Sequence, residues 1–218
     1  MLDTVLYVHI PLEEKPGQLR FVQFVRPENG QTVLPFFSDG LKAIEAAAGR
    51  VEVLPLLGRN LFAYTQGATL MLDPNERECV LYPEEIAALL TGAPMASVRG
   101  WETTAGETQA AFEPLGDLPE MFTVALSRIS QHLPSVTSVY VARLRWVHSM
   151  EQPALMIAIV AEESDHDQVM RAIATAIRPS VDTLDCPVDL TLLTPSKYAE
   201  HPMVIHGTRV YCKPKQES

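Results

Sequence analysis

The chain has 218 residues, a net charge of −10 and 47% hydrophobic residues, which is ordinary for a globular protein able to bury a core. This length suits one large domain or two small ones. Acidic residues are in excess in both halves, without a charged block. The balance argues against a sequence-independent nucleic-acid binder, which needs a basic surface.

The cysteines and the N-terminus bear on cellular location. Cys79, Cys186 and Cys212 form no CxxC pair and are odd in number, which favours a reduced cytosolic protein. The N-terminal residues 1–10 read as a strand and not as a secretory signal, and no apolar run is long enough to span a bilayer. The expectation is a cytoplasmic protein that contacts neither membrane nor nucleic acid.

The N-terminal residues predict a small antiparallel sheet. Strands are expected at 4–10, 19–25 and 32–37 from their apolar and β-branched content. The Asn29-Gly30 pair between the last two is a strong hairpin signal.

A helix is predicted directly after the third strand. Ser38 and Asp39 are residue types that cap helix N-termini, and Gly49 would end the helix. Its expected buried face consists of Leu41, Ile44 and Ala48. The unpaired N–H groups at such a helix start can also hold an anion.

The remainder of the first half predicts further strands and a second good helix. Val51 to Leu57 is an apolar strand, broken at 58–60 and followed by a short helix or turn at 61–66. Strands at 68–72 and 78–81 are expected to pair through a turn at Asp73-Pro74. The helix beginning at Pro83 has acidic residues in its first turn and Gly92 beyond its end.

A change of character separates two predicted domains, 1–95 and 117–218. Residues 96–116 show no sustained helical or strand periodicity and are expected to form a linker. Trp101 and Phe112 are large for a linker, so we expect both to pack on a neighbouring domain. The alternative for Trp101 is a binding surface.

The second domain predicts the order α-β-β-α-β, so the fold class is α/β and α+β in two small mixed domains. Strands are expected at 136–147, 154–161 and 188–193, with short strands at 203–205 and 210–212. Asp165 and Gln168 have the spacing of a capping box. The buried helix faces are expected to comprise Phe122, Leu126, Ile129 and Leu133 in the first helix, and Val169, Ile173 and Ile177 in the second.

The sequence gives only weak support for a catalytic or metal-binding site. Asp185 and Asp189 would raise the pKa of Cys186, which favours an inert thiol over a nucleophile. The spacing between His201 and His206 is within the range seen between zinc ligands, but no CxxC pair accompanies them. The acidic residues at 162–167 do not follow the residue order of a calcium-binding loop. Because phosphate-loop, dinucleotide and hydrolase motifs are also absent, no catalytic residue, metal or cofactor is predicted.

Three segments of the first half carry a family resemblance. Residues 33–39, 67–74 and 81–90 resemble, in this order, the N-terminal domain of the SseB family (enhanced serine sensitivity protein B). The second half, with its Pro187-Val-Asp189 segment, is similar to the SseB C-terminal domain. Asp73 stands where the family usually has Asn; a turn role survives this change, whereas a binding role for that Asn would not. The resemblance implies a bacterial protein and no catalytic residues.

Three functions are open at this point. The leading hypothesis is a non-catalytic protein–protein interaction or regulatory module whose partner is another protein. The second is a sensor of an amino acid or anionic metabolite, bound at the helix start by Ser38, Asp39, Asp73 and Asn75. There the Asp39 carboxylate would repel an anion, so a structural cap is the favoured role of this turn. The third is a thiol enzyme using Cys186 with His201 or His206, and homo-oligomerisation is also left open.

Overall fold

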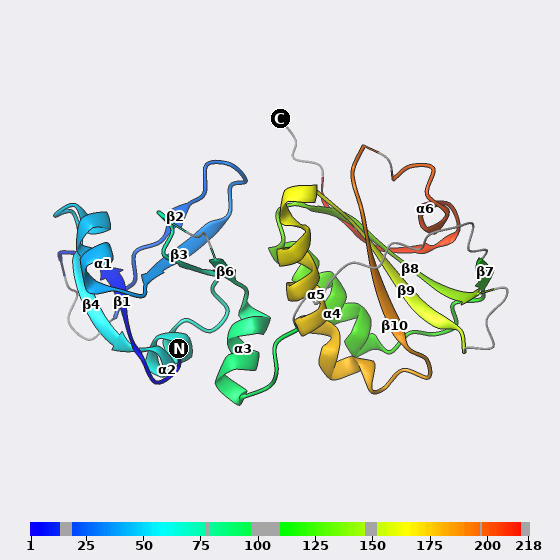
Figure 1. The fold of residues 1–218 in the computed structure, drawn as a ribbon, viewed down its shortest axis with the longest axis horizontal. Helices are drawn as coiled ribbons and strands as arrows, with labels where there is room; N and C mark the ends of the chain where they lie inside the picture. Colours follow the sequence, from blue (N-terminus) through cyan, green and yellow to red (C-terminus); the bar gives the residue numbers. More distant parts are fainter. Residues whose placement is uncertain (14–18, 77–78, 97–109, 147–151, 197, 215–218) are drawn as a thin grey trace. The chain divides into compact units, whose positions relative to one another are not determined.

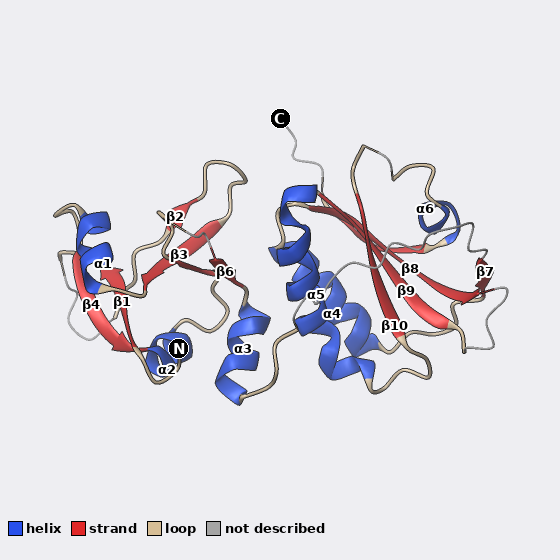
Figure 2. Ribbon diagram, in the orientation of Figure 1, coloured by secondary structure: helices blue, strands red, loops and turns tan. Residues whose placement is uncertain are grey.

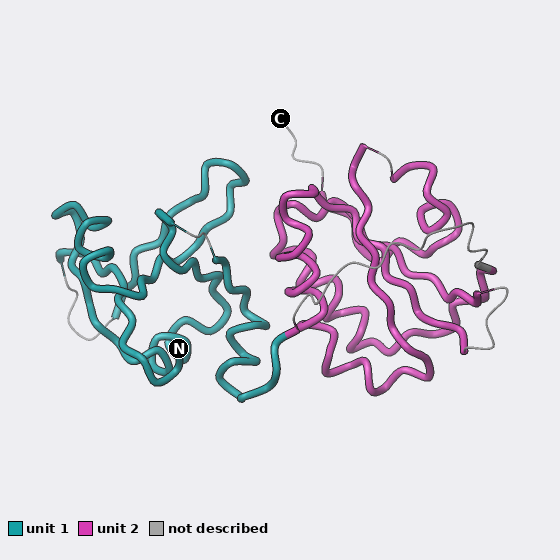
Figure 3. The backbone as a smooth tube through the Cα atoms, viewed as in Figure 1, with its two compact units in different colours: residues 1–95 teal, residues 96–218 magenta. Residues whose placement is uncertain are grey.

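Two separate β-sheets organise the chain (Figure 1). A computed structural model describes residues 1–13, 19–76, 79–96, 110–146, 152–196 and 198–214. The chain divides into two units, Met1–Met95 and Ala96–Ser218 (Figure 3), and each has its own sheet and helices (Figure 2). The predicted fold class of two mixed α/β units is therefore confirmed. Within the described ranges, no helix has both the length and the apolar character to cross a bilayer.

The sheet of the first unit is mixed. Its order is β4 (Glu52–Leu57), β1 (Val5–Ile10), β3 (Thr32–Phe37), β5 (Leu70–Leu72) and β6 (Cys79–Leu81), with β2 (Phe24–Val25) also beside β3. β3 runs parallel to β5, and the other pairs are antiparallel. The predicted pairing across the Asp73-Pro74 turn is thus confirmed.

The second strand is shorter than predicted. Only Phe24 and Val25 pair with β3, whereas the pattern predicted a strand over 19–25. The Val22 N–H donates to the His9 carbonyl at 2.9 Å, so this segment crosses from β1 to β3 and gains only a brief ladder. The hairpin turn itself is confirmed, because Gly30 takes a φ of 72° that favours glycine.

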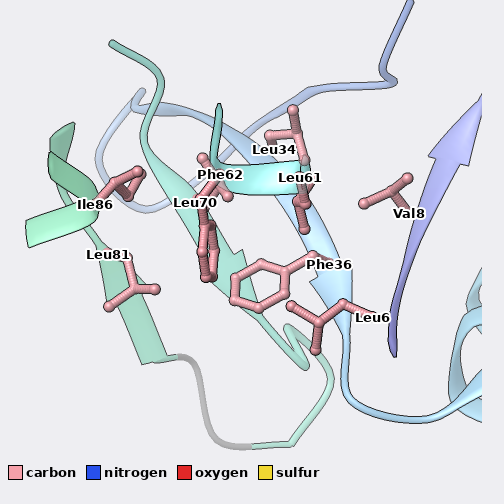
Figure 4. Close-up of a cluster of buried hydrophobic side chains, with 9 residues drawn as sticks. All are labelled: Leu6, Val8, Leu34, Phe36, Leu61, Phe62, Leu70, Leu81 and Ile86. Atoms are coloured by element: carbon pink, nitrogen blue, oxygen red, sulfur yellow. The ribbon is translucent and has the colours of Figure 1, made fainter. Parts of the chain in front are cut away.

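Along each strand of the first sheet, alternate residues point to opposite faces of the sheet. One face packs against α2 (Gly58–Tyr64) and α3 (Pro83–Thr91), and the other lies toward α1 (Gly40–Ala47). β3 shows the alternation, because Leu34 and Phe36 enter the core of the first face while Phe37 faces α1. Figure 4 shows this core cluster, which comprises Leu6, Val8, Leu34, Phe36, Leu61, Phe62, Leu70, Leu81 and Ile86.

The buried face of α1 differs from the prediction. Ala43 and Ala47 are buried, whereas Leu41 is 71% exposed and Ile44 59% exposed. The Nε2 atom of His9 lies 2.8 Å from the Ala43 carbonyl oxygen, so the helix approaches the sheet too closely for larger side chains. The helix ends at Ala47, followed by left-handed residues at Ala48 and Gly49.

Gly58 at the start of α2 lies against the N-terminal segment. This helix begins directly after β4, at the position where the sequence predicted a break. The Gly58 N–H donates to the Thr4 carbonyl and the Arg59 N–H to the Leu2 carbonyl, each at 2.9 Å. A Cβ at Gly58 would lie 2.2 Å from the Met1 carbonyl oxygen, which real contacts do not allow.

Gly58→Ala is therefore expected to destabilise the first unit by about 2 kcal/mol, because the N-terminal segment must move away. Urea unfolding of the full chain measures the change. Arg59→Ala, in the same turn and with a half-exposed side chain, is the control and should stay within about 0.5 kcal/mol. Equal effects of the two substitutions would contradict the steric argument.

The third helix forms as predicted. Pro83 occupies its first turn and Gly92 ends it in the left-handed conformation. The Tyr82 N–H donates to the carboxylate of Glu85 at 3.0 Å, which supplies half of a capping box.

The sheet of the second unit has the order β10 (Val188–Leu193), β9 (Ala154–Ala161), β8 (Val136–Trp146) and β11 (Thr208–Cys212). α4 (Glu120–His132) and α5 (His166–Val181) pack on each other and on this sheet, and the short 3-10 helix η1 (Glu163–Asp165) leads into α5. The predicted order α-β-β-α-β and the predicted buried faces of α4 and α5 are confirmed. A smaller cluster on the opposite face includes Tyr140, Ala158 and Leu193, and Met203 of α6 (Pro202–His206) joins it.

Part of the predicted linker belongs to this sheet. β7 (Ala110–Glu113) pairs antiparallel with β8, and Glu113 forms an ion pair with Arg145 at 2.6 Å. Phe112 packs against the smaller cluster of the second unit, in agreement with its predicted role. Trp101 lies outside the described residues.

Two further local predictions were wrong. Residues 203–205 were expected as a strand but lie in the helix α6, which His201 caps at its N-terminus with Pro202 following. Asp165 stands at the start of α5 but its side chain makes no capping hydrogen bond, because η1 already leads the chain into the helix. The predicted strand at 210–212 is confirmed within β11.

Candidate functional site

A cavity of about 670 Å³ opens beside α1 on the second face of the first sheet. We call it the α1 groove. Pro35 and Phe37 of β3 and Met71 of β5 line it on the sheet side, while Ala46 and Ala47 line it on the helix side. The alternation of β3 and β5 therefore presents an apolar surface here, opposite the core that Figure 4 shows.

Polar groups surround this apolar surface. Arg50 and Asn75 also line the groove, both are exposed, and neither side chain has a partner among the residues that the structure describes. Arg26, by contrast, is engaged with Glu28 at 2.5 Å. The α1 groove thus combines an apolar centre with a cation and an amide at its margin, neither of which pairs with a described residue.

His9 lines the groove and has a structural role. Its Nε2 atom hydrogen-bonds with the Ala43 carbonyl oxygen at 2.8 Å, and its ring lies 4.8 Å from that of Phe37. The side chain is buried, and these two contacts fix its orientation.

A network of hydrogen bonds joins the ends of β3 and β5 next to the groove. The Asp73 carboxylate accepts from the Ser38 N–H at 2.9 Å and from the Ser38 hydroxyl at 2.6 Å. The Lys42 ammonium lies 3.1 Å from Asp73 and 2.7 Å from Glu76. Asp73 itself takes a left-handed φ of 43°, which Asp and Asn tolerate better than most residues.

The charges of this network support one another. Burial disfavours the ionised form of Asp73, but the Ser38 hydroxyl and N–H and the Lys42 ammonium outweigh it and hold the pKa of this carboxyl below its ordinary value. Hydrogen bonds to Glu76 and then to Asp73 raise the pKa of Lys42. Asp73 and Lys42 therefore both stay charged around neutral pH.

The structure brings together most of the residues predicted to bind an anion, but Ser38 and Asp73 bind each other and Asp39 binds the backbone of α1. Asp39 caps α1 by accepting from the Leu41 N–H at 2.7 Å and the Lys42 N–H at 3.4 Å, which is the structural role favoured above. Asp73 takes the two donors of Ser38. Asn75 differs, since it lines both the α1 groove and a neighbouring cavity of about 150 Å³ beside Lys42 and Asp73.

The other candidate groups lie in the second unit. Burial and then the Asp185 carboxylate raise the pKa of the Cys186 thiol, with Arg143 acting in the opposite direction. The predicted effect of Asp185 is confirmed, whereas Asp189 is not among the groups that shift this pKa. Arg143 also pairs with Asp185 at 3.2 Å.

The two candidate histidines, His201 and His206, have local partners. The Nδ1 atom of His201 accepts from the Met203 N–H at 3.3 Å, and burial lowers the pKa of this histidine. The ring of His206 lies 5.0 Å from that of Phe112. Among the described residues, no group of three or more His, Cys, Asp or Glu side chains is placed to hold a metal ion.

Sequence reasoning missed the α1 groove itself. Its lining comes from β1, the β2 hairpin, β3, α1 and the β5 turn, and these segments share no local motif. The only sequence feature that marks Arg50 is its position, as a basic residue between the end of a predicted helix and an apolar strand. This feature alone does not indicate a groove.

The fold and the site define a two-unit mixed α/β protein with an open groove on its N-terminal sheet. Residues 1–88 match the SseB protein N-terminal domain, and residues 105–213 match the SseB protein C-terminal domain. The chain belongs to the SseB family, which confirms the resemblance seen in the sequence. No curated protein and no solved structure matches the chain. The α1 groove lies within the N-terminal family domain.

Proposed function

We propose that the chain is a cytoplasmic, non-catalytic binding module of a regulatory kind, and that the α1 groove holds an extended segment of a protein partner. One observation carries this proposal. The apolar residues Pro35, Phe37 and Met71 line an open cavity on a sheet face that α1 covers only in part. These three side chains are themselves buried and form the floor of the cavity. An apolar cavity with polar groups at its margin is typical of a ligand-binding site.

The charges of the groove indicate the chemistry of the partner segment. Arg50 is exposed and unpaired within the described structure, so an acidic residue of the segment would gain an ion pair there. Asn75 offers both a donor and an acceptor, which suits a peptide backbone. The expected ligand is therefore an extended peptide with apolar side chains and one acidic residue.

The fixed orientation of His9 supports a binding role over a catalytic one. A general base must reach the proton that it removes. The Nε2 atom of His9 is already engaged with the Ala43 carbonyl, and its ring is packed on Phe37. This imidazole holds α1 on the sheet.

Panning a random peptide library on the full chain tests the proposal. Peptides that combine apolar and acidic residues are expected to be enriched, and fluorescence anisotropy then measures their affinities. Ala46→Trp should abolish binding by filling the groove, while Ile44→Trp, on the exposed side of the same helix, should leave binding unchanged. Arg50→Ala should weaken binding about tenfold, the effect of about 1.4 kcal/mol. Equal binding to both tryptophan variants, or the absence of enriched peptides, would refute the proposal.

A small-molecule sensor is the second candidate, because a volume of about 670 Å³ lies within the range of ligand pockets. The ligand would be an amino acid or anionic metabolite held by Arg50 and Asn75. Thermal-shift screening over amino acids and phosphorylated metabolites separates the two functions. A ligand-induced shift in melting temperature that persists in Ile44→Trp and disappears in Ala46→Trp would favour the sensor. The absence of a shift with every compound would refute it.

A further inference from the structure

The second unit has an unpaired sheet edge at β10. The sheet order places β10 at the end, with β9 as its neighbour in parallel register. The Leu155 N–H donates to the Pro187 carbonyl at 2.8 Å, so the odd-numbered residues of this strand turn their backbone groups toward β9. The backbone groups of Val188, Leu190 and Leu192 therefore point outward, and no described residue pairs with them.

Other sheet edges carry features that discourage pairing. β4 contains Pro55, β6 has only 3 residues, and β11 has an irregular register between Arg209 and Tyr211. Proline, short length and bulges are the usual means by which proteins protect an edge. β10 has 6 residues, no proline and one charged residue, Asp189. Compared with these three edges, the edge of β10 is better suited to accept another strand.

A cavity of about 400 Å³ lies beside this edge, between β10 and α5. Val188 and Leu190 line it from the strand, and Ile177 and Val181 line it from the helix. The side chains of the outward-pointing residues thus share the face that α5 covers. A strand added at this edge would place its own apolar side chains against α5.

We propose that the edge of β10 pairs antiparallel with β10 of a second copy of this chain, about a two-fold axis at Leu190. In this register Leu190 faces Leu190 of the second copy, and Val188 faces Leu192 of the second copy. Each outward residue then exchanges both backbone hydrogen bonds with its opposite. Asp189 faces Thr191 of the second copy, so no like charges oppose each other.

The charges beside the cavity favour a second copy over an unrelated strand. Arg178 and Asp182 both line the cavity, and neither forms an ion pair with any described residue. Arg178 lies in the last turn of α5, and Asp182, four residues later, is its C-terminal cap. A two-fold axis makes the α5 helix of the second copy run in the opposite direction. Arg178 then lies toward Asp182 of the second copy, and the contact occurs twice, which is the self-complementarity of a symmetric dimer.

Analytical ultracentrifugation of the full chain over a concentration series tests this dimer. The wild-type chain is expected to show a concentration-dependent dimer. Leu190→Pro removes an outward N–H at the axis and should give a monomer with an unchanged circular dichroism spectrum. If Leu190→Pro fails to fold, charge reversal decides. Arg178→Asp and Asp182→Arg should each weaken association several-fold, and the double variant should restore it.

A cysteine pair at the axis provides an independent readout. Residues opposite each other in a hydrogen-bonded pair have Cα atoms about 5.5 Å apart, within the range of a disulfide. Leu190→Cys should therefore give a covalent dimer on oxidation, whereas Met121→Cys, on exposed α4 surface, should not. A monomer at every concentration, or a dimer that neither Leu190→Pro nor charge reversal weakens, would overturn the proposal.

Discussion

Phe36→Ala is expected to destabilise the first unit by about 3–5 kcal/mol. Phe36 lies near the middle of the core cluster, is 0% exposed, and its ring meets that of Phe62 edge to face at 5.9 Å (Figure 4). Truncation removes this contact and leaves a cavity that the surrounding strands can only partly fill. Because native stabilities are about 5–15 kcal/mol, the loss is a large share of the total.

Urea unfolding measures the loss, and hydrogen–deuterium exchange locates it. Exchange should rise across residues 1–95, while the sheet of the second unit stays protected, since each unit has its own core. Tyr64→Ala, 60% exposed at the end of α2, is the control and should change stability by less than about 0.5 kcal/mol. Similar midpoints for the two variants would show that Phe36 is not a central core residue.

Asp73→Ala is expected to cost about 3 kcal/mol, because two effects add. The substitution leaves the Ser38 N–H and hydroxyl without their acceptor, and it places alanine at a φ of 43°. Asp73→Asn retains one acceptor oxygen and tolerates this φ, so its cost should be about 1 kcal/mol. Thermal and urea unfolding measure both variants, and an equal loss in the two would contradict the role given to the acceptor.

The difference in stability between the wild-type chain and Asp73→Asn should also depend on pH. Because the pKa of Asp73 is lowered in the folded state, its contribution is present above the ordinary carboxyl pKa of 3.8 and is lost as pH falls through the lowered value. The stability gap between the two proteins should therefore be constant near neutral pH and should shrink in strong acid. A gap that widens on acidification would be inconsistent with the lowered pKa.

Local chemistry made much of the fold predictable. The Asn29-Gly30 turn, the Asp39 cap and the Pro83 helix start each depend on neighbours in the chain, and each was correctly predicted. β7 was missed because its Ala-Ala-Phe-Glu sequence becomes a strand only through its partner β8, which lies far along the chain. The buried face of α1 was wrong because the close approach of the helix to His9 favours alanine over leucine.

The candidate site divides in the same way. Ser38 and Asp73 were predicted together as members of an anion-binding site, and the parallel register of β3 and β5 brings them into contact. The hydrogen bonds from Ser38 to Asp73 could not be predicted, because they depend on the parallel register of these two strands. The α1 groove was not predictable either, since its volume depends on how far α1 covers the sheet.

The link between β3 and α1 consists of Ser38 and Asp39 alone, and both side chains are committed to hydrogen bonds. The helix that borders the α1 groove therefore cannot shift without disturbing the strand beneath it. The proposed binding site is therefore rigid before a ligand arrives, and the entropy lost on association would fall mainly on the ligand. Affinity for this surface should accordingly be improved more by stiffening the ligand, for example by cyclisation, than by enlarging it.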